Sequence, residues 1–258
     1  MPELSPTRRA LMRYCLHRGD TNLILGQRLG EWCGHGPVLE QDIALTNIAL
    51  DLVGQARSYY QYAAEIEGAG KTEDDLAYLR HERDFMNPLL CEVENGDWGQ
   101  TIMRQFLFDA HHFLLLSELV NSTDEHLAGI AAKSLKEVTY HRRYSSEWVV
   151  RLGDGTPESH GRMQRALDEL WRYTGELLRS APVDEEAAKF QLAPKPESLA
   201  IGYHDFVLPV LAKATLTVPE LPDVAMRTGG KRGVHTEKLG YVLAEMQHLQ
   251  RAYPGAEW

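Results

Sequence analysis

Residues 98–152 read WGQTIMRQFLFDAHHFLLLSELVNSTDEHLAGIAAKSLKEVTYHRRYSSEWVVRL and contain no proline. Because proline interrupts helices, this stretch has room for long ones. We predict helices at 98–121 and 124–152, each longer than about 20 residues, whereas the average globular helix has about 11 to 12. The turn Asn121-Ser122-Thr123 between them is short, so the two helices should pack antiparallel as neighbours. This arrangement indicates a helical bundle.

The rest of the chain also has helical periodicity. Within residues 38–66, apolar side chains recur at intervals of three to five, near the 3.6-residue helical period. We predict no strand. The stretches 180–196 and 217–234 are rich in proline, glycine and charge and should be loops. The predicted helices lie at about 5–17, 20–33, 38–66, 73–83, 98–121, 124–152, 158–179, 197–216 and 235–252.

Local signals mark several of the predicted helix ends. Serine, threonine or aspartate at the start of a helix caps its free N–H groups, and an acid three residues later strengthens the cap. Glycine after the last turn is a stop signal. The start signals are Thr72 with Asp75, Ser122 with Glu125, and Thr156-Pro157, and the stop is Gly153-Asp154-Gly155.

Length and composition are those of a folded globular protein. With 258 residues, 43% of them hydrophobic, the chain can bury a large core. We expect one domain over residues 1–258, with a bundle core at about 20–152 and a helical extension at about 157–258. The net charge of −10 would repel a phosphate backbone, so nucleic acid is not an expected partner.

Cysteine usage and apolar runs indicate the compartment. The three cysteines are odd in number and form no Cys-x-x-Cys pair, so neither a disulfide framework nor a zinc site is indicated. The N-terminus lacks a basic start with an apolar run, and no segment has 18 consecutive apolar residues. We expect a cytoplasmic protein that is neither exported nor embedded in a membrane.

Acidic and histidine side chains stand close together on the two long helices. Asp109 and His112 are three residues apart, and Glu137 and His141 are four apart, so each pair shares a helical face. Ferritin-like bundles bind two metal ions through carboxylates and Glu-x-x-His motifs, and such ligands suit iron or manganese. Each pair alone is more typical of a structural or solvated role than of a metal site, whereas all four residues together on adjacent helices favour an inherited site. From the residues alone, a dimetal site stays open.

Several stretches over nearly the whole chain form long and specific signatures. They are residues 30–37 (GEWCGHGP), 42–45 (DIAL), 51–57 (DLVGQAR), 104–109 (RQFLFD), 146–148 (SEW), 233–237 (GVHTE) and 246–256 (MQHLQRAYPGA). Together they resemble the structural C subunits of ring 1,2-phenylacetyl-CoA epoxidases, which are multicomponent monooxygenases. The resemblance implies an all-α, ferritin-like four-helix bundle with additional N- and C-terminal helices.

The resemblance also implies that metal ligands have been lost. In the related catalytic subunit, the second bundle helix carries Asp-Glu-Ala-Gly-His, whose Glu and His bind iron. The matching residues 51–55 read Asp-Leu-Val-Gly-Gln, so Leu52 and Gln55 stand at the ligand positions. Leucine cannot bind a metal.

On the fourth bundle helix, the catalytic pattern Lys-Glu-Glu-Ser-Phe-His matches residues 136–141. Val138 then stands at a ligand position and Glu137 at the acid before it, while Asp109 and His141 persist as ligand types. We expect a vestigial site with no metal and no catalytic residue in this chain. Asp109 and His141 should satisfy each other or nearby hydrogen-bond partners, since an isolated buried ion is costly.

The resemblance implies a non-catalytic structural subunit in a complex that epoxidises the ring of phenylacetyl-CoA with dioxygen, in aerobic phenylacetate degradation. The expected partners are a catalytic alpha subunit that carries the di-iron centre, a small subunit and an NADPH-dependent iron–sulfur reductase. This chain itself should carry no cofactor. Association of the chain with itself stays open.

Two other classes of function stay open. An active dimetal oxygenase could use Asp109, His112, Glu137 and His141, with new ligands such as Glu31 and Asp51. A stand-alone helical binding module would have no oxygenase partner.

The stretch Gly229-Gly230-Lys231-Arg232-Gly233 combines flexible backbone with two cations, which could cradle an anion. It lacks the Walker spacing, so we favour a flexible loop.

Overall fold

A computed structural model describes residues 4–222 and 225–256. The chain divides into two compact units. Unit 1 comprises the residues up to Val93, Ala181–Phe190 and the residues from Gly229 on, and unit 2 comprises Glu94–Ser180 and Gln191–Thr228. The prediction of one domain over residues 1–258 stays a prediction.

The described residues form helices and no strand, which confirms the prediction of an all-α fold. The four long helices that a ferritin-like bundle needs are present as two hairpins, one in each unit. Within residues 4–222 and 225–256, none of the helices has both the length and the apolar composition of a membrane span.

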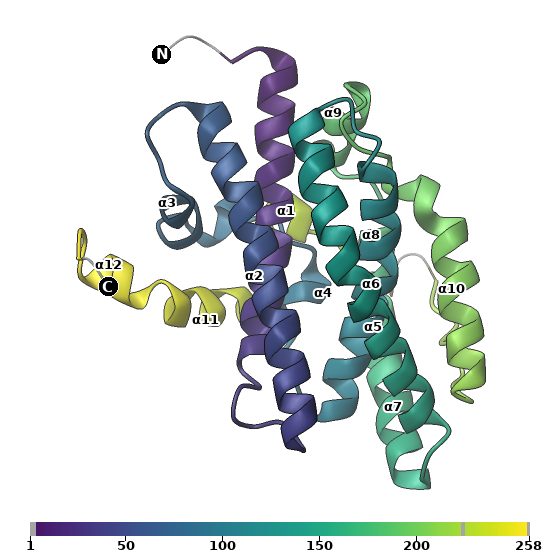
Figure 1. Cartoon of the computed structure of the whole chain (residues 1–258). Coiled ribbons are helices and arrows are strands. Elements are labelled where there is room, and N and C mark those ends of the chain that lie inside the picture. Colours follow the sequence, from purple (N-terminus) through teal and green to yellow (C-terminus); the bar gives the residue numbers. More distant parts are fainter. Residues whose placement is uncertain (1–3, 223–224, 257–258) are drawn as a thin grey trace. The chain divides into compact units, whose positions relative to one another are not determined.

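The hairpin of unit 1 consists of α1 (Pro6–Gly30) and α2 (Leu39–Glu67), which lie side by side (Figure 1). The predicted interruption of α1, between helices at 5–17 and 20–33, is wrong. Gly19 does not end the helix because it packs against the ring of Tyr60, where a Cβ would overlap the ring. The glycine therefore allows two helices to approach closely, a role that its sequence neighbourhood does not distinguish from that of a helix end.

The middle of α1 is enclosed on every side. All residues from His17 to Gly26 are buried, whereas a surface helix buries only one stripe. Within unit 1, α1 contacts α2, α4, α9 and α11. Polar side chains on α1 thus lie in the interior, where each needs a partner.

Shorter helices surround this hairpin. Thr72 and Asp75 form the predicted capping box, with the Asp75 N–H donating to the Thr72 hydroxyl (3.2 Å). The prediction of a loop over 180–196 is partly wrong, because Asp184 accepts from the Ala181 N–H (2.8 Å) and starts a helix there. The shorter elements of unit 1 are α3 (Glu73–Tyr78), η1 (Glu82–Asp84), α4 (Leu89–Glu92), α9 (Pro182–Lys189), η5 (Gly230–Arg232), α11 (Glu237–Met246) and α12 (His248–Ala252).

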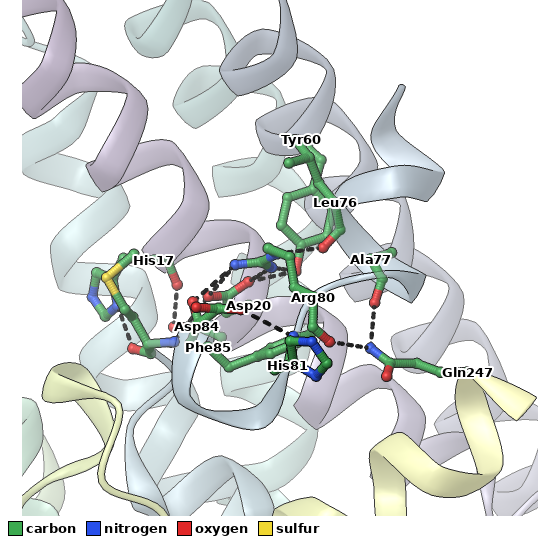
Figure 2. A network of polar contacts seen from close by, with 12 residues as sticks. His17, Asp20, Tyr60, Leu76, Ala77, Arg80, His81, Asp84, Phe85 and Gln247 are labelled. Atoms are coloured by element: carbon green, nitrogen blue, oxygen red, sulfur yellow. Dashed lines mark hydrogen bonds and ion pairs between the residues drawn. The ribbon is translucent and has the colours of Figure 1, made fainter. Parts of the chain in front are cut away.

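Asp20 of α1 is the centre of a polar network (Figure 2). Its carboxylate accepts from the Tyr60 hydroxyl (2.6 Å) and the Met86 N–H (2.9 Å), and it pairs with the Arg80 guanidinium. The Gln247 amide donates to the Arg80 carbonyl (3.1 Å), which ties the C-terminal helices to this network. Burial raises the pKa of Tyr60 well above its usual value, so the phenol stays a donor.

Unit 2 is built on the hairpin of α5 (Trp98–Leu119) and α6 (Glu125–Gly153), close to the predicted ranges (Figure 1). Both helices contact α7 and α10. The remaining elements of unit 2 are α7 (Pro157–Leu170), η2 (Trp171–Tyr173), α8 (Thr174–Leu177), η3 (Pro196–Leu199) and α10 (Ala200–Lys213).

The helix-end signals of unit 2 are confirmed except one. Thr156 caps α7 by accepting from the Ser159 N–H (3.2 Å), and α6 ends at Gly153. Ser122 does not cap α6. Asp124 does so, accepting from the Leu127 N–H (2.8 Å), because a carboxylate there also interacts favourably with the positive end of the helix dipole.

Asp20→Asn should destabilise the protein strongly. The Asp20 side chain is fully buried and that of Arg80 is only 14% exposed, so the neutral amide would leave a buried guanidinium without its counter-charge. We expect a loss of about 3–5 kcal/mol in the free energy of unfolding, measured by urea titration. The exposed Glu65→Gln on α2 is the control and should change stability by less than about 0.5 kcal/mol. Equal effects of the two variants would contradict this role of Asp20.

Candidate functional site

Asp109 lies in the middle of α5 and is completely buried. Its Oδ1 accepts a hydrogen bond from Gln105 Nε2 (2.6 Å), one turn earlier on the same helix. Its Oδ2 accepts one from the Ser145 hydroxyl (2.8 Å) on α6. Sequence reasoning singles out neither partner, although Gln105 stands four residues before Asp109 and Ser145 four after His141. That spacing is the signal that could have found them.

The interior makes Asp109 a weaker acid than usual. Burial raises the pKa of Asp109 to about 6, because the carboxylate loses its hydration. The charges of His141 and Arg142 and the hydrogen bonds from Ser145 and Gln105 act in the opposite direction, but burial outweighs them. Asp109 therefore changes its protonation state at a mildly acidic pH.

One face of α6 points into the interior. Val138, His141 and Ser145 recur at helical spacing and are all buried. Val138 has no exposed surface, so an isopropyl group is packed at the position where the resemblance implies a lost ligand. His141 lies close enough to Asp109 for its charge to affect the carboxylate. Glu137, by contrast, lies on a partly exposed side of α6, since neighbours on a helix diverge by about 100°.

Leu52 and Gln55 lie on α2, in unit 1, and both are buried. Leu52 packs against Gly26 of α1, where an added methyl group would lie 3.4 Å from the Leu52 Cβ. The side chain at this position is thus hydrocarbon in close packing with a neighbouring helix. It offers no lone pair to a metal ion.

The residues of the alternative dimetal site differ in burial and in the contacts that they make. His112 is buried on α5, with its ring centroid 4.9 Å from that of Phe108. Glu31 follows the end of α1 and pairs with Arg28 (2.8 Å), with 41% of its side chain exposed. Asp51 is half-buried on α2. Across the part of the chain that the structure describes, no group of three or more His, Cys, Asp or Glu side chains is arranged to hold a metal ion.

The glycine-rich stretch at 229–233 is a tight turn and includes η5. Lys231 is 5% exposed, and its Nζ donates to Asp184 Oδ2 (2.8 Å). The backbone of Gly230 packs against the Asn87 carbonyl, which leaves no space for a side chain. The lysine therefore pairs with a carboxylate of its own unit, and Gly230–Arg232 form a 3-10 turn within the stretch that was predicted to be a flexible loop.

Comparison with known proteins places the chain among proteins of phenylacetic acid catabolism. Residues 2–258 match the family described as "Phenylacetic acid catabolic protein". The C subunit of 1,2-phenylacetyl-CoA epoxidase from Escherichia coli (strain K12) is 49% identical over 248 residues, which are 96% of this chain and 99% of that protein. These matches confirm the resemblance carried by the signature stretches. The chain belongs to the phenylacetic acid catabolic protein family.

Proposed function

We propose that this chain is a non-catalytic structural subunit of a phenylacetyl-CoA ring 1,2-epoxidase that acts in aerobic phenylacetate degradation. The similarity to the C subunit of such an epoxidase, 49% identity over 96% of this chain, supports this function. Its long helical hairpins supply extensive helix faces, and interfaces between permanently associated subunits often bury more than about 2,000 Å².

The observation that carries the non-catalytic role is the packing at the positions of the lost ligands. Leu52 and Val138 are apolar and have no exposed surface. Both oxygens of Asp109 accept hydrogen bonds, one from Gln105 and one from Ser145. The hydrocarbon packing of Leu52 and Val138, each within its own unit, and the hydrogen bonds to Asp109 support the loss of metal ligation at these positions.

The chemistry of the complex then belongs to its other subunits. A catalytic alpha subunit holds the di-iron centre that activates dioxygen, and a reductase delivers electrons from NADPH. A small subunit completes the assembly. This chain, located in the cytoplasm, stabilises the catalytic subunit and carries no metal of its own.

Co-expression with the other oxygenase subunits tests this assignment. The chain purified alone should contain no stoichiometric iron and should form no epoxide from phenylacetyl-CoA with reductant and oxygen. Co-expressed, it should purify with an iron-containing subunit, and the complex should be active. Stoichiometric iron and turnover by the isolated chain would instead support the dimetal oxygenase. A stable homo-oligomer that ignores the iron subunit would support the stand-alone module.

Substitution of the retained residues separates the structural from the catalytic alternative. In the assembled complex, Asp109→Asn and His141→Gln should each leave kcat/KM within about threefold, a change of less than about 1 kcal/mol. Loss of a residue that only hydrogen-bonds to a metal ligand typically lowers activity by roughly 10–100-fold. If Asp109 and His141 were themselves metal ligands, kcat/KM should fall by more than that. Measurement of iron content alongside kcat/KM would show whether any loss of activity follows loss of metal.

The raised pKa of Asp109 makes stability depend on pH. Between about pH 4 and pH 6, folded Asp109 keeps its proton whereas the unfolded chain loses it, so this residue lowers stability as pH rises through that window. The shift from 3.8 to about 6 corresponds to about 3 kcal/mol. Asp109→Asn should therefore gain stability relative to the wild type by about this amount between about pH 4 and pH 6.5.

Urea unfolding of both proteins at several pH values measures this difference. Asp168→Asn on α7 is a matched control, because the exposed Asp168 accepts a hydrogen bond from Gln164 (2.9 Å) at the same four-residue spacing. This control should show no comparable gain, since an exposed carboxylate keeps its hydration. A difference between wild type and Asp109→Asn that does not change with pH would contradict the role of burial.

A further inference from the structure

Arg18 on α1 is a buried cation that pairs with no carboxylate in the part of the chain that the structure describes. Only 1% of it is exposed. Its Nε and Nη2 are both enclosed and have no hydrogen-bond partner, and none of the described carboxylates forms an ion pair with it. Other buried or partly buried basic side chains of unit 1 do have carboxylate partners; the pairs are Arg80 with Asp20, Lys231 with Asp184, His235 with Glu92, and Arg28 with Glu31. An unbalanced buried charge costs several kcal/mol, so Arg18 requires an explanation.

The free atoms of Arg18 are those that bind anions best. Nε and Nη2 lie on one edge of the planar guanidinium and present two parallel N–H groups, the arrangement that holds anions in a bidentate manner. This edge is unused by the described residues of the protein.

Two more donors without partners lie near this edge. Asn22 stands one turn after Arg18 on the same face of α1, and both polar atoms of its side chain are enclosed without a hydrogen bond. Tyr59 of α2 lies beside the Arg18 guanidinium, which interacts with the phenol oxygen as a donor, and among the described residues the enclosed Tyr59 O–H has no acceptor. Neither Asn22 nor Tyr59 has exposed surface. A guanidinium, an amide and a phenol thus offer unused N–H and O–H groups within one helix pair.

The neighbouring acidic groups cannot balance the charge. Burial raises the pKa of Tyr59 to about 12 and raises that of Tyr14 as well, so both phenols are neutral at physiological pH. Asp184, which like Arg18 acts electrostatically on Tyr14, already accepts hydrogen bonds from Lys231 Nζ (2.8 Å) and from the Ala181 N–H (2.8 Å). The positive charge of Arg18 therefore calls for an anion from outside the chain.

We propose that Arg18, Asn22 and Tyr59 bind a small monovalent inorganic anion such as chloride. One guanidinium balances one negative charge, and a spherical ion can accept from donors that converge from α1 and α2. In the network of Figure 2, the Asp20 carboxylate pairs with Arg80 and accepts from the Tyr60 hydroxyl. The anion would likewise pair with Arg18 and accept from the Tyr59 hydroxyl. Its function is to hold the central hairpin of unit 1 together, and it is independent of the proposed role in the epoxidase.

Thermal unfolding of the full chain in chloride and in gluconate, at equal ionic strength, tests the proposal. Gluconate is too large for an enclosed site between two helices. Chloride at about ten times its Kd should raise Tm by about 3–6 °C, and the rise should saturate. Arg18→Gln should abolish this dependence. The matched control is Arg13→Gln on the same helix, whose side chain is 38% exposed and pairs with Glu186 at the surface, and which should keep the dependence.

Diffraction from crystals of the wild-type chain grown in bromide gives a second measurement that needs no variant. An anomalous peak in contact with Arg18 Nε and Nη2 would support the proposal. Water at that position, or bromide only at surface sites, would overturn the proposal. Equal Tm values in chloride and gluconate, together with the absence of this peak, would also overturn it. If Arg18→Gln does not fold, or the two measurements disagree, the bromide map decides.

Discussion

Burial of α1 on all sides means that each charged side chain in its middle must be balanced inside the protein. Asp20 meets this requirement with Arg80 and with hydrogen bonds from Tyr60 and Met86. Water cannot solvate a charge at these positions. Burial of a charge without a partner therefore destabilises the fold by more free energy than one hydrogen bond contributes to stability. The short segments that wrap around α1 are therefore held in place by polar contacts to this helix as well as by apolar packing.

The same requirement governs the interior of unit 2 with a different outcome. Asp109 has neutral donors, Gln105 and Ser145, and only the more distant charges of His141 and Arg142. These do not offset its desolvation, so its pKa rises instead.

Regular features of the fold were predictable because they depend on neighbours in the sequence. The absence of proline and the capping residue Thr156 place α5, α6 and α7 close to where they are found. The predicted break between helices at 5–17 and 20–33 is wrong because Gly19 packs against Tyr60, a residue some forty positions away that no local pattern connects to it. The helix α9 was missed because a segment rich in proline and charge looks like a loop, although Pro182 and Asp184 start a helix there.

The candidate site divides in the same way. The sequence by itself determined the residues at the positions where the resemblance implies lost ligands, and the hydrocarbon side chains of Leu52 and Val138 cannot coordinate a metal. Only the tertiary structure decided that Gln105 and Ser145 bond to Asp109, that Lys231 pairs with Asp184, and that none of the described carboxylates pairs with Arg18. The physical reason is that the energy of a buried polar group depends on the few atoms that enclose it, and those atoms come from segments distant in the sequence.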